Sequence, residues 1–489
     1  MDGERDSNLP ARPDEAQVPR VGVDEWVATH EGRLRRNRLV AELERVPRPA
    51  FYLAFGVAAA LLPVITNDGY IIRVGFDTLL YMLLALGLNI VVGYAGLLDL
   101  GYVAFYGFGA YSYAMLASPK FGLHWDTLAI LPVVVVASAL LGFLVAIPSR
   151  RLVGDYLAII TLFFLQLFVT VYQNGNRISI LGLTRGYDMT GGPNGIPGVD
   201  NWDLGGLKIS SLNGYFYAAL ITFIVLLGIV YLIDQSRTGR AWKSLREDPL
   251  AAELMGMPVN RLKLIAFACG AAIAGLTGTL FAALNTAVFS ADFDVPTLII
   301  VYAMLILGGA GSLGGVILGA LVVNVSLEFL RTPGHATWVF YVVVVATLIA
   351  RIRPWRWLAV VLGGTVALGY IVHAIAASAW PRGTHGDVSV GGWLGSWLKG
   401  WELHPTNPMF IGNIAFVILV FAVLALTLLQ GWQRRVAMIP TLYLASFAWE
   451  NRLVIEPSIT RLILIGVILI VLMNARPQGL LGTSRVEIV

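Results

Sequence analysis

The chain has 489 residues, of which 57% are hydrophobic and 13% are charged. A soluble domain of this length needs far less apolar surface, so the composition predicts an all-α polytopic membrane protein. The formal net charge of +4 lies in short basic clusters between apolar runs. That pattern orients membrane helices and gives no reason to expect a nucleic-acid partner.

The first segment, residues 1–48, is polar and has no apolar h-region after the first methionine. We therefore expect a cytoplasmic N-terminal extension and no signal peptide. Its basic residues place this side in the cytoplasm under the positive-inside rule; they are Arg33, Arg35, Arg36, Arg38, Arg45 and Arg48.

Apolar stretches long enough to cross the hydrocarbon layer then recur along the chain, and we expect roughly ten to fourteen transmembrane helices. The predicted spans are 50–67, 73–93, 95–117, 127–147, 154–174, 214–233, 263–284, 296–309, 313–330, 338–350, 357–378, 409–430, 436–449 and 459–474, with 313–330 and 436–449 the weakest. The single cysteine, Cys269, lies within an apolar run and is expected to be a small core residue.

The remaining charges fit an alternating topology. The inside clusters are Arg150 and Arg151; Arg237, Arg240, Lys243 and Arg246; Arg351, Arg353 and Arg356; and Arg434 and Arg435. Two longer loops, 174–213 and 379–408, are expected outside, the second with tryptophans suited to the membrane interface, Trp380, Trp393, Trp397 and Trp401. This order leaves residues 459–489 as a last helix followed by a cytoplasmic C-terminus.

Two glycine-rich runs interrupt the apolar pattern. They read Gly93-Tyr-Ala-Gly-Leu-Leu-Asp-Leu-Gly-Tyr102 and Gly308-Gly-Ala-Gly-Ser-Leu-Gly-Gly315. Paired interruptions of this kind often border a transport path, and the alternative is tight helix packing alone. The candidate path residues are Gly93, Tyr94, Gly96, Asp99, Gly101, Gly308, Gly309 and Gly311.

Two acids near these runs need separate readings. Asp99 either contacts substrate or, as we favour, fixes a helix break, because an acid at membrane depth must face protein or water. Asp155, after the inside arginines, is expected to cap a helix N-terminus and not to carry protons.

A polar, basic segment between apolar runs, about residues 234–262, is predicted to dock another component. Pro249 suits the first turn of a helix, Glu247 and Asp248 suit its positive end, and Ala251, Ala252 and Gly256 leave a smooth face. Arg246 precedes this turn.

The sequence contains no motif for ATP binding, metal binding or hydrolysis. The chain has no phosphate-binding Gly-Lys-Ser/Thr loop, no paired Cys or His motif for a metal and no recognisable Ser-His-Asp pattern. We therefore expect no enzyme activity and no cofactor bound by this chain. His373, His385 and Glu402 are read as parts of a solvated outer loop.

The segment Leu250-Ala-Ala-Glu-Leu-Met-Gly256 resembles the coupling segment of ABC importer permeases, with Leu250 where glutamate is usual. Further runs extend the likeness: Gly93–Tyr106, Gly154–Leu162, Thr190-Gly-Gly-Pro-Asn-Gly-Ile196, Arg246–Pro249 and Arg476-Pro-Gln-Gly-Leu-Leu-Gly482. Together they resemble the LivM-type permease of branched-chain amino acid ABC importers, over residues 50–330 and 459–482.

The resemblance implies a LivH-type permease partner, two ATPase subunits that use ATP, an extracytoplasmic solute-binding protein that could rest on Thr190–Ile196, and the amino acids Leu, Ile or Val as substrate in a bacterial or archaeal cytoplasmic membrane. It places the coupling contact at Arg246–Gly256. Residues 331–458 depart from the family and are read as an insertion of some four extra spans within the 49–330 and 459–489 permease core.

Three alternatives remain at this stage. A related permease for urea or short amides would look nearly the same. An ion-coupled secondary transporter would need an intramembrane carrier, for which only Asp99 is available. A polytopic membrane enzyme would need a reactive cluster near a membrane face.

Overall fold

The computed structural model describes residues 48–149, 155–176, 188–206, 208–352, 355–380, 384, 391–405, 408–455, 460–463, 466, 470 and 479–481. Several sequence predictions lie outside these residues: the N-terminal extension before Arg48, the inside residues Arg150, Arg151 and Arg353, Gly154, His385, most of the span 459–474, and the ends of the Arg476–Gly482 run.

The chain divides into two compact units, Met1–Leu61 with Ser484–Val489, and Leu62–Thr483. The first contributes one described helix, α3 (Arg48–Ala60). The second contains everything described below.

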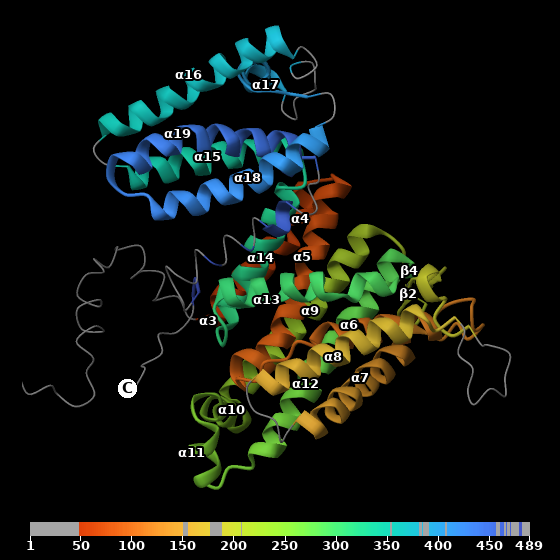
Figure 1. The fold of residues 1–489 in the computed structure, drawn as a ribbon. Coiled ribbons are helices and arrows are strands. Elements are labelled where there is room, and N and C mark those ends of the chain that lie inside the picture. The colour runs from red at the N-terminus through yellow and green to blue at the C-terminus, as the bar shows by residue number, and fades with distance from the viewer. Residues whose placement is uncertain are drawn as a thin grey trace, which may run out of the picture. The chain divides into compact units, whose positions relative to one another are not determined.

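The second unit begins with the short helix α4 and a set of longer apolar helices, shown in Figure 1. They are α4 (Leu62–Ile65), α5 (Gly69–Leu88) continued by the π-helical turn η2 (Asn89–Tyr94), α6 (Tyr102–Leu116), α7 (Thr127–Ser149), α8 (Asp155–Gln173), α9 (Leu212–Gln235), α12 (Val259–Asn285), α13 (Val295–Gly308) and α14 (Leu313–Phe329). Between α9 and α12 lie the short helices α10 (Arg237–Glu247) and α11 (Pro249–Leu254).

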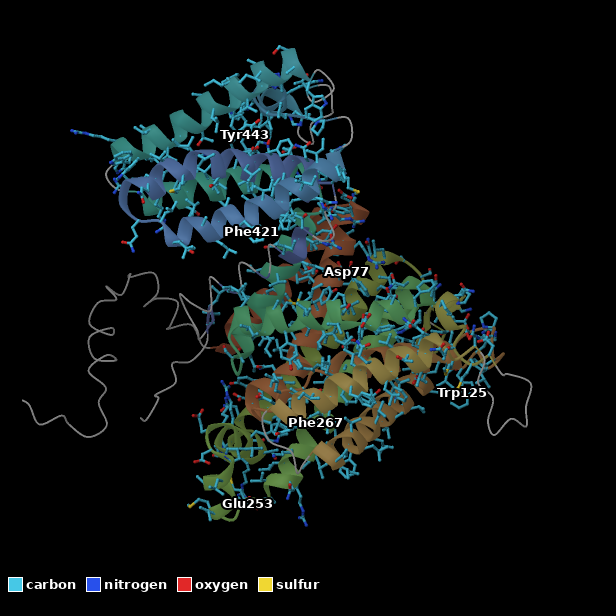
Figure 2. The ribbon with its side chains drawn as sticks, viewed as in Figure 1. Asp77, Trp125, Glu253, Phe267, Phe421 and Tyr443 are labelled. Carbon is cyan, nitrogen blue, oxygen red and sulfur yellow. The ribbon has the colours of Figure 1, made fainter. Side chains whose placement is uncertain are left out.

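Helix α12 is the centre of this core and packs against α5, α6 and α7. Small residues permit the close approach: a Cβ on Gly109 of α6 would collide with the backbone of Gly275, and one on Gly142 of α7 would lie 2.5 Å from Cβ of Ala271. Phe267 of α12 is 1% exposed and is labelled in Figure 2. The core is therefore built by small-residue contact around one helix.

Short strands tie the loops at one end of these helices. β1 (Ile196–Pro197) pairs antiparallel with β4 (Ala287–Val288), and β2 (Trp202–Asp203) pairs with β3 (Lys208–Ile209). The turn η3 (Gly192–Asn194) precedes β1, and η4 (Ser290–Phe293) follows β4. The loop predicted at 174–213 is thus an ordered element where it is described.

The described residues contain eight helices long and apolar enough to cross a membrane, or up to nine if a bent pair forms one span. This confirms the polytopic helical class, with fewer described spans than the ten to fourteen expected. The predicted span 95–117 is interrupted, because residues 95–101 are not helical and α6 has 15 residues, about 22 Å of helix. α14 and the following helix are bent by 114°, and the helix predicted near 436–449 contains Pro440.

Residues after Leu330 form a second group of helices. They are α15 (Pro333–Arg351), α16 (Trp355–Ala379), α17 (Gly392–Trp401), α18 (Pro408–Leu428), α19 (Gly431–Ala448) and the π-helical turn η6 (Trp449–Leu453). Tyr443 and Trp401 belong to one of their buried clusters, whereas Phe421 of α18 is 66% exposed (Figure 2). α16 and α18 are each long and apolar enough to cross a membrane, and α15 is so only together with α14.

One expectation for this region is corrected, and it concerns the loop after α16. Part of that loop folds into the amphipathic helix α17, which buries Trp401 against Trp397 and Tyr443. Glu402 is fully buried rather than solvated, and its carbonyl lies 3.0 Å from Nδ1 of His373. The cap of α17 draws this residue into the helix group.

The two ends of the segment 331–458, which the sequence predicts to be an insertion, lie together. Leu330 and Ala336, before and at the start of α15, share a buried cluster with Trp449 and Val454 at the other end. Phe340 stacks on Trp449 with ring centroids 4.3 Å apart. Adjacent ends allow an extra segment to join a domain without displacing its other elements.

Candidate functional site

The predicted docking segment folds as two short helices joined at Asp248. Ser236 accepts a hydrogen bond from the Gly239 amide and begins α10. Asp248 Oδ1 accepts from the amides of Leu250 and Ala251, at 2.8 and 3.0 Å, and Pro249 occupies the first turn of α11. The local expectation for Pro249 and Asp248 is confirmed, because proline and an acidic cap both suit a helix N-terminus. Glu247 instead ends α10.

The face that α11 presents differs from the one expected. Ala252 is 3% exposed and faces this chain's own core, so it cannot belong to a docking surface. Ala251 is exposed, and a Cβ on Gly256 would meet nothing within 4 Å. The sequence reasoning missed three large apolar residues that are 66–82% exposed: Leu250, Leu254 and Met255. Their spacing along an otherwise polar segment was the available signal.

Helix α10 is anchored firmly to its neighbours. The Trp242 side chain is fully buried, and its Nε1 donates to the Leu262 carbonyl of α12 at 2.9 Å. Lys243 Nζ lies 2.6 Å from Asp234 Oδ1 of α9, and the same ammonium stands 5.6 Å from the ring centroid of Tyr94. Movement of α10 therefore involves α9, α12 and the turn that contains Tyr94.

Arg246 connects the docking segment to both glycine-rich runs. Its Nη1 donates to the Gly93 carbonyl in the first run and to the Ala310 carbonyl in the second, the latter at 3.3 Å. The second run is also bonded to the turn η2 that leads into the first, since the Gly311 amide donates to Asn89 Oδ1 at 2.8 Å. Residues from three distant parts of the sequence thus meet at one guanidinium.

The glycines are needed at this junction for two physical reasons. Gly96, Gly309 and Gly311 have positive φ of 69°, 106° and 89°, which other residues adopt only with strain. Close approach requires Gly93, Gly101 and Gly308: a Cβ on Gly93 would lie 2.6 Å from the Gly311 nitrogen, and one on Gly101 would lie 2.6 Å from the Thr161 carbonyl oxygen. Gly308 faces Gly315 in the same manner.

Asp99 is fully buried within the first run. Its Oδ1 accepts from the Gly101 amide at 2.9 Å, and its carbonyl accepts from the Tyr302 hydroxyl at 2.7 Å. The neighbouring Leu100 amide donates to Thr161 Oγ1 at 2.8 Å. These bonds hold the non-helical stretch before α6, which supports the structural reading of Asp99 over direct substrate contact.

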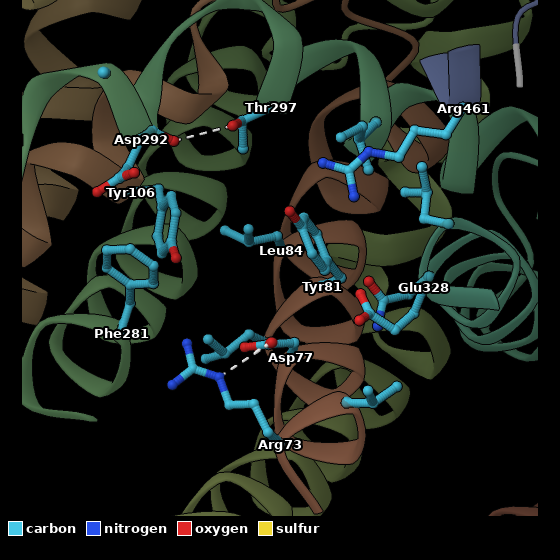
Figure 3. A pocket seen from close by; sticks show the side chains of 16 residues that line it. Arg73, Asp77, Tyr81, Leu84, Tyr106, Phe281, Asp292, Thr297, Glu328 and Arg461 are labelled. Atoms are coloured by element: carbon cyan, nitrogen blue, oxygen red, sulfur yellow. Dashed lines mark hydrogen bonds and ion pairs between the residues drawn. The ribbon is translucent and has the colours of Figure 1, made fainter. Parts of the chain in front are cut away.

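A cavity of about 350 Å³ lies along α5, away from the end of this helix that leads into Gly93. Figure 3 shows the residues that line it. One stripe of α5 supplies Arg73, Asp77, Tyr81 and Leu84 at helical spacing. Opposite it stand Tyr106, Phe281, Asp292, Thr297, Ile300, Asn324, Leu327, Glu328 and Arg461. None of the predicted path residues lines this cavity. Charged residues at i and i+4 in the apolar helix α5 were the sequence signal that could have indicated it.

The loop described at residues 188–195, which the sequence predicts to be external, is held by polar contacts. Lys120 Nζ donates to Asp188 Oδ1 at 2.9 Å, and this hydrogen bond lowers the pKa of the Asp188 carboxyl below its usual value. The Gly191 amide donates to the same oxygen at 2.7 Å, and Thr190 Oγ1 donates to the Tyr172 carbonyl. Among the residues the structure describes, no group of three or more His, Cys, Asp or Glu side chains could hold a metal ion.

Comparison with known proteins shows which family the sequence matches. The family described as "Branched-chain amino acid transport system / permease component" matches residues 70–352. The chain is 37% identical over 309 residues to the high-affinity branched-chain amino acid transport system permease protein LivM of Salmonella typhimurium, covering 58% of this chain and 69% of that protein. The LivM protein of Escherichia coli is 36% identical over the same shares.

A second type of permease is also similar. The LivH protein of Salmonella typhimurium is 25% identical over 263 residues, covering 50% of this chain and 80% of that protein. No solved structure matches the chain significantly. Arg461 and most of the inserted helices lie beyond the residues that the family matches.

Proposed function

Since the chain belongs to the family of branched-chain amino acid transport system permease components, we propose that it forms half of a translocation path for Leu, Ile and Val. It is a multi-pass protein of the cytoplasmic membrane, as its apolar helices and its LivM relatives indicate. The path is completed by a second, LivH-type permease, because proteins of both types are similar to this chain.

The observation that carries the mechanism is the position of Arg246. The exposed face of α11, with Leu250 and Leu254, and the following Gly256 form the surface on which an ATPase subunit would rest. Arg246 lies on α10, next to that surface, and bonds the carbonyls of Gly93 and Ala310. A displacement of the docked helices is therefore passed to both glycine-rich junctions.

Transport then follows from two arrangements of the same packed helices. ATP binding closes the ATPase pair, which moves α10 and α11. The junctions at Gly93–Gly101 and Gly308–Gly311 shift with Arg246. The helices next to these junctions then tilt, and the path opens to the other side of the membrane. ATP is bound by the partner subunits and not by this chain.

The remaining partners follow from this orientation. With α10 and α11 in the cytoplasm, the loop at residues 188–195 lies outside, where an extracytoplasmic solute-binding protein delivers substrate. The ordered contacts of Asp188 with Lys120 and Gly191 give such a protein a defined surface. The inserted helices α15–α19 join at the same outer side.

The proposal is tested by affinity purification of the tagged chain from native membranes in mild detergent, with mass spectrometry of the bound proteins. A second permease and ATP-binding subunits in roughly equal amounts would support it. Recovery of the chain alone, in detergent that preserves a known ABC complex, would overturn it. A Leu254→Asp variant should lose the ATPase and keep the second permease. Arg240→Gln, at an exposed position of α10, should keep both.

A further inference from the structure

The cavity beside α5 contains opposite charges that are not paired with each other. Arg461 and Glu328 both line it, and within the described part of the chain Arg461 forms no ion pair. Figure 3 shows both side chains on one side of the cavity, with Tyr81 beside them. Opposite charges that face the same space without closing on each other leave room for a ligand that bridges them.

Glu328 is held in place from outside the cavity. The Tyr70 hydroxyl donates to its Oε1 at 2.7 Å, and Arg331 Nη1 donates to the same oxygen at 3.0 Å. None of the described residues bonds Oε2, and the side chain is 22% exposed. The carboxylate is thus fixed by bonds on one oxygen and presents the other, which is the preorganisation that a ligand site requires.

The second charged pair in the cavity is already satisfied. Arg73 Nε lies 3.2 Å from Asp77 Oδ2, and Arg73 Nη2 donates to Asn285 Oδ1 at 2.7 Å. Asp292 stands on the opposite side of the cavity from Arg461 in Figure 3. Arg73 and Asp77 thus satisfy each other. Glu328 is the carboxylate on the same side of the cavity as Arg461, and its ion pair with Arg331 uses only Oε1.

The space between these charges also has an apolar lining. Leu84 is 1% exposed, and Leu80 and Leu327 are buried beside it. Ile300 closes the same wall. The volume of about 350 Å³ lies at the small end of the range for small-molecule sites, roughly 300–1,000 Å³. A compact ligand with an aliphatic group fits this surface.

We propose that Arg461 and Glu328 bind the two charged ends of a zwitterionic, aliphatic α-amino acid within the permease. The guanidinium takes the α-carboxylate through paired hydrogen bonds, and the Glu328 carboxylate takes the α-ammonium. The side chain rests on Leu80, Leu84 and Leu327. This assignment rests on the proposed function and adds the residues that recognise the substrate; urea or a neutral amide carries neither charge.

The inserted segment bears directly on this site. Glu328 lies just before it and Arg461 just after it, and the buried cluster of Leu330, Ala336, Trp449 and Val454 holds the two connections together. Arg461 lies outside the residues that match the family. Residues 331–458 therefore connect the two positions whose charges bind the substrate.

The test measures equilibrium binding to the assembled permease–ATPase complex in lipid nanodiscs without binding protein, at roughly pH 6.5 so that amino groups are charged. The probes are L-leucine, L-leucinamide, which lacks the carboxylate, and 4-methylpentanoate, which lacks the ammonium. Arg461→Gln should weaken leucine about ten- to hundredfold and leave leucinamide unchanged. Glu328→Gln should weaken leucine and leucinamide and leave 4-methylpentanoate unchanged.

Two further variants serve as controls. Arg461→Lys retains the charge and should recover part of the leucine affinity. Arg434→Gln, at an exposed position of α19, should leave the affinity for all three probes unchanged. Equal losses for all three probes, no loss for either variant, or wild-type binding of 4-methylpentanamide as tight as leucine would overturn the site. ATP-driven leucine uptake that persists in both variants would overturn the site alone, whereas its absence from the wild-type complex would overturn the proposed function.

Discussion

Arg246 and Gly93 lie 153 positions apart in the sequence and are joined by a hydrogen bond from the guanidinium to the glycine carbonyl. The same guanidinium reaches Ala310, so one side chain connects a surface helix to two interruptions of membrane helices. Distant elements that share one charged donor move together more readily than elements in apolar contact alone, because the bond has a fixed geometry.

Loss of Arg246 should uncouple the system. Arg246→Ala leaves the Gly93 and Ala310 carbonyls without this donor, at a cost of roughly 1–3 kcal/mol for each buried group. We expect ATP hydrolysis by the reconstituted complex to continue while leucine uptake falls at least tenfold. Arg240→Ala, which loses only a bond to the Gln235 carbonyl at an exposed site, is the matched control and should keep both activities. Parallel loss of hydrolysis and uptake in Arg246→Ala would argue against a transmitting role.

Gly256 offers a separate test of the docking surface. Its φ is +78° and its Cβ position is open, so Gly256→Ala adds backbone strain of about 1–2 kcal/mol without bulk. Gly256→Arg adds the same strain together with a large charged side chain. We expect the arginine variant to insert into the membrane and lose ATPase binding, and the alanine variant to retain it. Normal uptake by Gly256→Arg would show that the surface around Gly256 does not bind the ATPase subunit.

Asp99 should behave as a structural acid. Asp99→Asn keeps an oxygen that can accept from the Gly101 amide, whereas Asp99→Ala removes it from a fully buried position. We expect uptake to survive in the asparagine variant and the free energy of unfolding to fall by about 1–2 kcal/mol in the alanine variant, as for a lost helix cap. Thermal unfolding in detergent measures this. If Asp99→Asn stays folded but transports nothing, the acid carries a proton or contacts substrate.

The buried carboxyl of Glu402 should make the thermal stability of the inserted helices depend on pH. Burial raises the pKa of its carboxyl well above the ordinary value, and the nearby Glu450 raises it further. Because the folded pKa exceeds the unfolded one, about 4.3, the stabilisation is complete below that value and is lost as pH rises through the folded pKa. The difference in Tm between Glu402→Gln and the wild type should therefore grow with pH. Tm curves that run parallel from pH 5 to 9 would contradict this.

Much of this arrangement could be predicted from residues whose local chemistry is decisive. Pro249 and Asp248 specify a helix start wherever they fall, so α11 was predictable. The apolar runs predicted most of the long helices, since hydrocarbon thickness sets their length. Gly96 and Gly311 indicated unusual backbone, because positive φ favours glycine.

Other features depend on tertiary contacts that no single sequence displays. Arg246 was predicted at the docking surface, but its bonds to Gly93 and Ala310 come from packing between α10, η2 and the α13–α14 junction. Ala252 was assigned to the wrong face because α11 has six residues and its orientation depends on α12. The Arg461–Glu328 site joins residues on either side of the insertion, so no local pattern could pair them.

The most direct test of the account is uptake of radiolabelled leucine into proteoliposomes that contain the complete complex, with binding protein outside and ATP enclosed. We predict accumulation that requires enclosed ATP, persists when a protonophore is added and is competed by isoleucine and valine. Accumulation that proceeds without ATP and collapses with the protonophore would contradict the account and identify an ion-coupled transporter.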